Sequence, residues 1–167
     1  HYRSHSFPTR RSSDLKIECI QNFVNEKINN FTPYKNTKAI IVSNFEYKDP
    51  MLQRLKTPSN DGKKIKDLLG RKFGFEVFFL ENANKNEILE SIKDLQNILT
   101  NEDGLLIYFA GHSSLGIKNK NKGFLQPIDA DFDVEDNWIS YEEIDQEIDK
   151  LKVKDVLLII DGCYPGA

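Results

Sequence analysis

The sequence has few of the residues that cross-link a protein or anchor it in a membrane. Its 167 residues include two cysteines, Cys19 and Cys163, which form neither a disulfide framework nor a paired metal motif. No apolar run is long enough to span a bilayer. We therefore expect a soluble globular domain in a reducing, cytoplasmic setting, with no membrane contact.

The chain also lacks an excess of charge of one sign. Its 23 Lys and Arg residues against 26 Asp and Glu residues give a formal net charge of -3. The one dense basic stretch, KNKNK at Lys118 to Lys122, is interpreted as a solvated loop. No basic surface for nucleic acid is predicted, so we exclude nucleic acid as a partner.

Histidine is scarce as well. Residues 1–15 (HYRSHSFPTRRSSDL) are rich in Ser and Arg and have no apolar periodicity. We interpret them as a non-native or artefactual segment, with a transit peptide as the alternative. His1 and His5 fall within this segment, so His112 is the only histidine in the rest of the sequence. The search for a catalytic imidazole is thereby narrowed to one residue.

Residues 16–37 are predicted to form an N-terminal helix and a linker, and residues 38–167 to form the main domain. The helical spacing in the first of these segments is carried by Ile17, Ile20, Val24 and Ile28. The pattern stops near Pro33, where a helix is expected to end.

Short apolar runs within the main domain predict buried strands over residues 39–42, 75–80, 105–110 and 156–160. Helices are predicted between them by three sets of apolar residues at helical spacing: Ile65, Leu68, Leu69 and Phe73; Ile88, Ile92, Leu95 and Leu99; Ile144, Ile148 and Leu151. Strands that read as unbroken apolar runs and alternate with helices are typical of a parallel sheet covered on both faces.

The ends of two predicted helices carry capping signals. Ser59, Asn60 or Asp61 is expected to cap the first helix, and Gly74 to end it. Ser140 is expected to cap the third, because Glu143 follows it at the spacing of a capping box.

His112 and Cys163 lie 51 residues apart, each just past the end of an apolar run. Parallel strands joined by a helical crossover are usually neighbours, about 4.8 Å apart, so their tips are expected to be adjacent. Ligands bind at that edge of such sheets, and a thiol beside an imidazole makes a nucleophile with its proton shuttle. Alone, either residue would more simply be structural. Their joint placement favours a catalytic dyad.

The two segments resemble the paired catalytic blocks of the caspase and metacaspase superfamily. YFAGHS and IIDGCYPG are close to the usual family forms YFAGHG and IIDSCYSG. The resemblance covers roughly residues 38–167 and includes RLKTPSNDGKKIKDLL, GFEV and GFLQPIDAD. It implies a caspase-like α/β three-layer sandwich with a mainly parallel central sheet. It also implies a Cys/His peptidase, of which residues 38–167 are the large-subunit part.

The resemblance assigns roles to individual residues. Cys163 would be the nucleophile and His112 the general acid and base. The backbone N–H groups of Ser113 and Cys163 would form the oxyanion hole. The family usually has glycine after the histidine and serine before the cysteine, so Ser113 and Gly162 depart from its pattern. Neither departure removes a reacting atom.

Asp161 and Asp61 match aspartates that, in metacaspases, bind the side chain preceding the cleaved bond. Two carboxylates in one pocket favour Arg or Lys there, because a buried cation needs a paired charge. No arginine matches those with which true caspases bind an aspartate. The alternative reading makes Asp61 a helix cap and Asp161 a turn residue.

The acidic stretch from Asp129 to Asp136 has carboxylates at alternating positions, as calcium loops do, and some metacaspases need calcium. It lacks the glycine and the terminal glutamate of an EF-hand loop. We interpret it as a solvated acidic loop, with calcium binding as the alternative, and expect no required cofactor and no other metal.

These observations together predict a cysteine endopeptidase that cleaves protein or peptide substrates after Arg or Lys. Its remaining partner would be the missing small-subunit portion of the same protein. One alternative is a catalytically weak caspase-like module for signalling or assembly, which would fit Ser113 and Gly162. Another is a flavodoxin-type domain that binds a small molecule at the same edge. A phosphate-binding glycine loop after the first strand would favour the latter, and the sequence lacks one.

Overall fold

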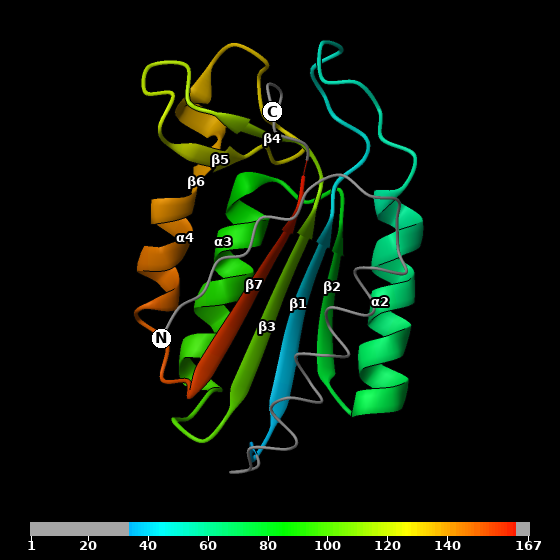
Figure 1. Ribbon diagram of the computed structural model, residues 1–167, viewed down its shortest axis with the longest axis vertical. Helices are drawn as coiled ribbons and strands as arrows, with labels where there is room; N and C mark the ends of the chain where they lie inside the picture. The colour runs from blue at the N-terminus through cyan, green and yellow to red at the C-terminus, as the bar shows by residue number, and fades with distance from the viewer. Residues whose placement is uncertain (1–33, 163–167) are drawn as a thin grey trace.

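A four-stranded parallel sheet forms the centre of the protein (Figure 1). The computed structural model describes residues 34–162. The strands are β1 (Thr37–Ser43), β2 (Glu76–Glu81), β3 (Gly104–Ala110) and β7 (Asp155–Asp161), in the spatial order β2-β1-β3-β7. All three pairings are parallel. The predicted parallel sheet is confirmed, as is the adjacency of the two strands that precede His112 and Cys163.

Helices cover both faces of this sheet. Helix α2 (Pro58–Phe73) lies on one side, and α3 (Lys85–Lys93) and α4 (Tyr141–Ile148) lie on the other (Figure 1). A short 3-10 helix, η1 (Asp94–Asn97), continues α3. The predicted three-layer sandwich is therefore confirmed.

The strands divide their apolar side chains between two cores, because successive residues of a strand point to opposite faces. Ile41, Leu106 and Tyr108 belong to the core under α2. Ile107 and Phe109 belong to the larger core under α3 and α4. Every residue of β3 is buried, which explains why its sequence shows no polar alternation.

The prediction that Ser59, Asn60 or Asp61 caps α2 is wrong. The helix begins earlier, with Pro58 as its first residue after Thr57. Proline favours that position because its fixed φ suits the first turn and its missing N–H is not needed there. Gly74 ends the helix at a φ of 70°, as predicted. The capping box of Ser140 and Glu143 at the start of α4 is also confirmed.

A second, antiparallel sheet was not predicted. It consists of β4 (Ser113–Leu115), β5 (Gly123–Leu125) and β6 (Ile139–Ser140), and it lies beyond the carboxyl ends of the main strands (Figure 1). Strands of two or three residues are too short to show an apolar period. Because β4 begins directly after His112, this small sheet fixes the backbone on the far side of that residue.

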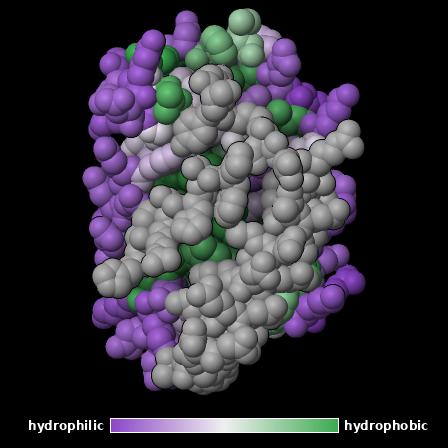
Figure 2. Space-filling model, in the orientation of Figure 1, coloured by the Kyte–Doolittle hydropathy of each residue, from purple (hydrophilic) through white to green (hydrophobic). Residues whose placement is uncertain are grey.

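The predicted N-terminal helix and residues 1–15 lie outside the described residues. Within residues 34–162, no helix is long and apolar enough to cross a membrane. Apolar atoms show at the upper end of Figure 2, the end at which the carboxyl ends of the main strands lie in Figure 1. Exposed apolar side chains in the loops and small sheet that follow these strands are Met51, Leu115, Ile117, Phe132 and Val134.

Candidate active site

His112 lies at the carboxyl edge of the sheet, two residues past the end of β3. Ala110, the last residue of β3, is the register partner of Asp161, the last residue of β7. The Gly111 N–H donates to the Asp161 carbonyl at 3.2 Å, so the two chains stay together as they leave the sheet. Cys163 follows Asp161 by two residues, as His112 follows Ala110, but lies outside the described residues.

The imidazole of His112 is held by a backbone carbonyl. Its Nε2 atom lies 2.8 Å from the carbonyl oxygen of Gln53. A carbonyl can only accept a hydrogen bond, so Nε2 carries the proton in this contact, and in the neutral ring Nδ1 is the acceptor. The sequence analysis missed Gln53, because a backbone atom supplies the contact and leaves no signal in the residue type.

Tyr47 also contacts His112 and was not predicted. The His112 backbone N–H donates to the Tyr47 hydroxyl at 2.7 Å. The two rings are tilted by 51° with their centroids 4.6 Å apart. Burial raises the pKa of Tyr47 well above its usual range, against the opposing effect of the hydrogen bond from His112. Tyr47 therefore stays a neutral hydroxyl at ordinary pH.

Ser113 and Gly162, the two departures from the family pattern, contact each other. A Cβ atom added at Gly162 would lie 2.4 Å from Ser113 Oγ and 2.8 Å from Ser113 Cβ. Ser113 itself is 3% exposed. The serine side chain therefore occupies the space that a side chain at position 162 would need, so the residues at these two positions constrain each other.

Asp161 and Asp61 both lie close to the hydroxyl of Tyr108. The Tyr108 hydroxyl donates to Asp161 Oδ2 at 2.9 Å. Burial raises the pKa of Tyr108, and the negative charges of Asp161 and Asp61 raise it further. Asp61 is in the first turn of α2 and is 9% exposed. The structure thus brings the two predicted pocket carboxylates to one buried hydroxyl on the α2 face of the sheet.

The acidic stretch at residues 129–136 does not have the features of a calcium site. Asp129 Oδ1 accepts the Lys85 N–H at 3.1 Å, and Glu135 Oε2 accepts the Ile117 N–H at 2.6 Å. Within the described part of the chain, no group of three or more His, Cys, Asp or Glu side chains is placed to hold a metal ion. These contacts fit a solvated loop whose carboxylates bind the protein's own backbone.

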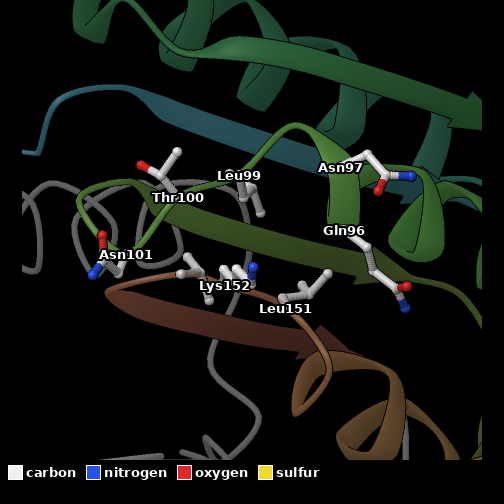
Figure 3. A pocket seen from close by; sticks show the side chains of 8 residues that line it. Gln96, Asn97, Leu99, Thr100, Asn101, Leu151 and Lys152 are labelled. Carbon is white, nitrogen blue, oxygen red and sulfur yellow. The ribbon is translucent and has the colours of Figure 1, made fainter.

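A hollow of about 590 Å³ lies at the opposite end of the sheet (Figure 3). It is lined by residues that precede β3 and β7: Gln96, Asn97, Leu99, Thr100, Asn101, Leu151, Lys152 and Val153. These side chains are polar or aliphatic, and Lys152 is the single charged one. The hollow is therefore separate from the edge that carries His112, and it contains no acid–base pair.

Fold and site together define a caspase-like α/β sandwich with an oriented histidine at the sheet edge. The family model of the caspase domain matches residues 36–167, more than half of the chain. The chain therefore belongs to the caspase-domain family, a family of cysteine peptidases. The resemblance stated from the sequence is confirmed.

Comparison with solved structures supports the same fold. The crystal structure of protein GSU0716 from Geobacter sulfurreducens matches with a TM-score of 0.65 at 17% sequence identity. The match covers 79% of this chain and 52% of that one, so the chain spans about half the length of this structural neighbour. At such an identity the likeness shows the fold alone. No curated protein matches the chain.

The family match also decides against the flavodoxin-type alternative. The strand order β2-β1-β3-β7 is shared by flavodoxin-type sheets, whose first strands follow the order 2-1-3-4, so topology alone does not separate the two. The caspase-domain match does separate them.

Proposed function

We propose that this chain is the large-subunit part of a cysteine endopeptidase that uses Cys163 as nucleophile and His112 as general acid and base. The observation that carries the proposal is the hydrogen bond from His112 Nε2 to the Gln53 carbonyl. It fixes the ring at the tip of the strand next to the one that leads to Cys163. An imidazole with one nitrogen bound in this way has its other nitrogen available for proton transfer.

The proposed reaction follows from that assignment. The Cys163 thiol gives its proton to His112 Nδ1, and the thiolate attacks the scissile carbonyl carbon. The imidazolium then protonates the leaving amine, which departs and leaves an acyl group on the sulfur. Water attacks this thioester with His112 taking its proton, and the acid product and free thiol are released. The Gln53 carbonyl accepts a hydrogen bond from Nε2–H throughout and stabilises the charged ring.

The backbone N–H groups of Ser113 and Cys163 are the proposed oxyanion hole. Support comes from the pairing of β4 with β5. The Gln126 N–H donates to the His112 carbonyl at 2.9 Å, so residues 112 and 126 form a hydrogen-bonded pair. In antiparallel strands the next residue then directs its N–H away from the partner strand. The Ser113 N–H therefore faces away from β5.

Cleavage after Arg or Lys is proposed from Asp161 and Asp61. Two carboxylates beside one buried hydroxyl form an acidic surface that a guanidinium or ammonium group would neutralise. A caspase that bound aspartate there would need cations in place of these groups. The metacaspase branch of the family is therefore the proposed subtype.

The missing small-subunit portion is proposed to pair with β7. Among residues 34–162, β7 pairs on one side only, with β3. A strand from the segment after residue 167 would extend the sheet there and complete the substrate groove. The proposed compartment is the cytoplasm, where reducing conditions keep the nucleophile a thiol.

The decisive test is activity of the complete protein on peptides with Arg or Lys before the cleaved bond. We expect cleavage that is abolished by Cys163→Ala and labelling of Cys163 by a thiol-directed peptide inhibitor. If the complete protein neither cleaves these peptides nor reacts with the inhibitor, the peptidase proposal is wrong and the signalling module takes its place.

Specificity is tested with Asp161→Asn and Asp61→Asn. Each is expected to lower kcat/KM about 10- to 100-fold on Arg and Lys peptides, because each removes a charged partner of the substrate cation worth about 1.5–3 kcal/mol. Asp67→Asn, on the exposed face of α2, and Asp155→Asn, which removes the charge of a carboxylate with the same kind of tyrosine contact at the other end of β7, are matched controls. Equal effects of controls and test variants would exclude an acidic pocket for Arg or Lys.

A further inference from the structure

Tyr47 joins the candidate site to a small core of its own. It lies in the segment between β1 and α2, residues 44–57, and its ring packs against the cluster of Leu52, Phe124, Ala130 and Trp138. Trp138 is 2% exposed and meets Phe124 edge-on, with ring centroids 5.7 Å apart. The Tyr47 ring is therefore packed against this cluster on one side and contacts His112 on the other.

The hydroxyl of Tyr47 takes a hydrogen bond that the sheet ladder would otherwise make. In a hydrogen-bonded antiparallel pair both residues exchange N–H and carbonyl groups. Gln126 donates to the His112 carbonyl, but the His112 N–H donates to the Tyr47 hydroxyl at 2.7 Å. The ladder thus ends at His112, and the Tyr47 hydroxyl, in place of the neighbouring strand, accepts the hydrogen bond from the His112 N–H.

Gly111 makes this approach possible. A Cβ atom at position 111 would lie 2.7 Å from the Tyr47 hydroxyl and 3.0 Å from the Phe109 ring. Any side chain here would push the phenol away from the His112 N–H. Glycine at position 111 therefore leaves the space that the Tyr47 hydroxyl needs beside His112.

The segment that carries Tyr47 also carries Gln53. Its two ends are joined by a hydrogen bond from the Leu55 N–H to the Phe45 carbonyl at 3.1 Å. Its start is fixed by Asn44, whose side chain binds both backbone groups of Ala83 at 2.8 and 2.9 Å. Both contacts of His112 thus come from one closed segment, Tyr47 holding the backbone and ring face and Gln53 holding the ring nitrogen.

We propose that Tyr47 is a positioning residue for His112: it holds the imidazole so that its Nε2–H stays on the Gln53 carbonyl and its Nδ1 remains the proton acceptor. The inference rests on the proposed peptidase function. Tyr47 does not take part in proton transfer. It fixes the backbone and packs on the ring of the residue that does.

The main test is Tyr47→Phe in the complete protein. This variant keeps the ring and removes only the hydroxyl. We expect kcat to fall about 10- to 100-fold, the effect of a slightly misplaced catalytic group, with KM changed by less than about twofold. Tyr34→Phe is the matched control, because Tyr34 also donates its hydroxyl to another element, Asp155, but at the opposite end of β7. It should leave kcat unchanged.

A second measurement does not depend on activity. The ring N–H protons of His112 are followed by nitrogen-15 NMR in the full chain and identified by their loss in His112→Gln. In the wild type we expect a slowly exchanging Nε2–H, and in Tyr47→Phe an exchange at least about tenfold faster, because the ring leaves the carbonyl more often.

The outcomes separate the two proposals. If Cys163→Ala abolishes activity but Tyr47→Phe retains kcat within about twofold, the positioning role is wrong and the peptidase stands. If the wild type is inactive, the peptidase fails, and the NMR measurement alone decides on Tyr47. Unchanged exchange of the Nε2–H in Tyr47→Phe overturns the positioning role in either case.

Discussion

Ser113 and Gly162 lie in the two segments that carry the proposed dyad, and the Ser113 side chain fills the volume that a side chain at position 162 would need. Ser113 Oγ lies 2.4 Å from where a Cβ atom at position 162 would be. With serine at 113 and glycine at 162, only one side chain needs that volume. The usual family residues, glycine at the first position and serine at the second, also supply only one side chain. The departures therefore do not by themselves favour an inactive module.

The first prediction concerns this pair. Gly162→Ser alone should lower the melting temperature and kcat/KM, because two side chains then overlap between the strand tips. Adding Ser113→Gly should restore most of both. Thermal unfolding and peptide hydrolysis of the two single variants and the double variant give the coupling energy, which we expect to be about 1–3 kcal/mol. Strictly additive effects would mean that the two positions are independent.

Helix α4 depends on its first turn more than α2 does. Ser140 accepts the Glu143 N–H at 3.1 Å and completes a capping box, whereas Thr57, the cap residue of α2, makes no side-chain capping bond within the described residues. Ser140→Ala should therefore cost about 1 kcal/mol in the free energy of unfolding, and Thr57→Ala a few tenths at most. Urea denaturation of both variants measures the difference. Similar losses would contradict the assignment of the caps.

Asn44 ties the loop after β1 to the loop after β2. It is completely buried and hydrogen-bonds both backbone groups of Ala83. Asn44→Ala leaves the Ala83 N–H and carbonyl without these partners, so we expect a loss of about 2–4 kcal/mol in the free energy of unfolding. Asn101→Ala, in an exposed turn, should change it by less than about 0.5 kcal/mol. Chemical denaturation of both variants checks the contrast.

The main strands could be predicted from the sequence because burial on both faces leaves an unbroken apolar run, as in β3. The adjacency of β3 and β7 followed from the preference of crossover-linked strands to be neighbours, whereas the place of β1 between β2 and β3 does not follow from it. The small antiparallel sheet could not be predicted, since β4 and β5 have three residues each and include polar ones. Short pairings of this kind are decided by tertiary contacts and not by local pattern.

The sequence supplied candidates for the site residues, but it did not indicate the groups that support His112. His112 follows β3, Asp161 ends β7 and Asp61 lies in the first turn of α2, which are positions that sequence patterns mark. The Gln53 carbonyl and Tyr47 reach His112 from residues 59 and 65 positions earlier in the chain, across a loop without regular structure. The spacing of apolar residues in the sequence does not predict such contacts. The structure alone therefore identifies what orients the imidazole.

The stability of the whole molecule should fall in alkaline solution. Burial is the first cause that raises the pKa of Tyr47 and Tyr108 above the ordinary value of 10.0. A group with a raised folded-state pKa contributes stability that is fully present below pH 10 and is lost as the pH rises beyond it. Each of the two tyrosines should then reduce the free energy of unfolding by up to about 1.4 kcal/mol per pH unit.

The measurement is urea denaturation between about pH 8 and about pH 11.5, a range that brackets the ordinary pKa of tyrosine. The pH slope should be smaller in Tyr108→Phe than in the wild type. Tyr34→Phe should lower the slope as well, because burial and the hydrogen bond to Asp155 raise the pKa of Tyr34 above its ordinary value. A slope that is the same in all three proteins would show that tyrosine ionisation is not what destabilises the fold.

The support of His112 depends on an intact backbone in the closed segment of residues 44–57, which is far from His112 in the sequence. A single break in the backbone between Tyr47 and Gln53 would leave the parallel sheet, His112 and the β7 strand chemically intact. The ring would nevertheless lose the rigid spacing between its two supports, which now comes from one short stretch of chain. If the proposed dyad operates, a cut in this segment would inactivate the protein without damage to any group that performs chemistry.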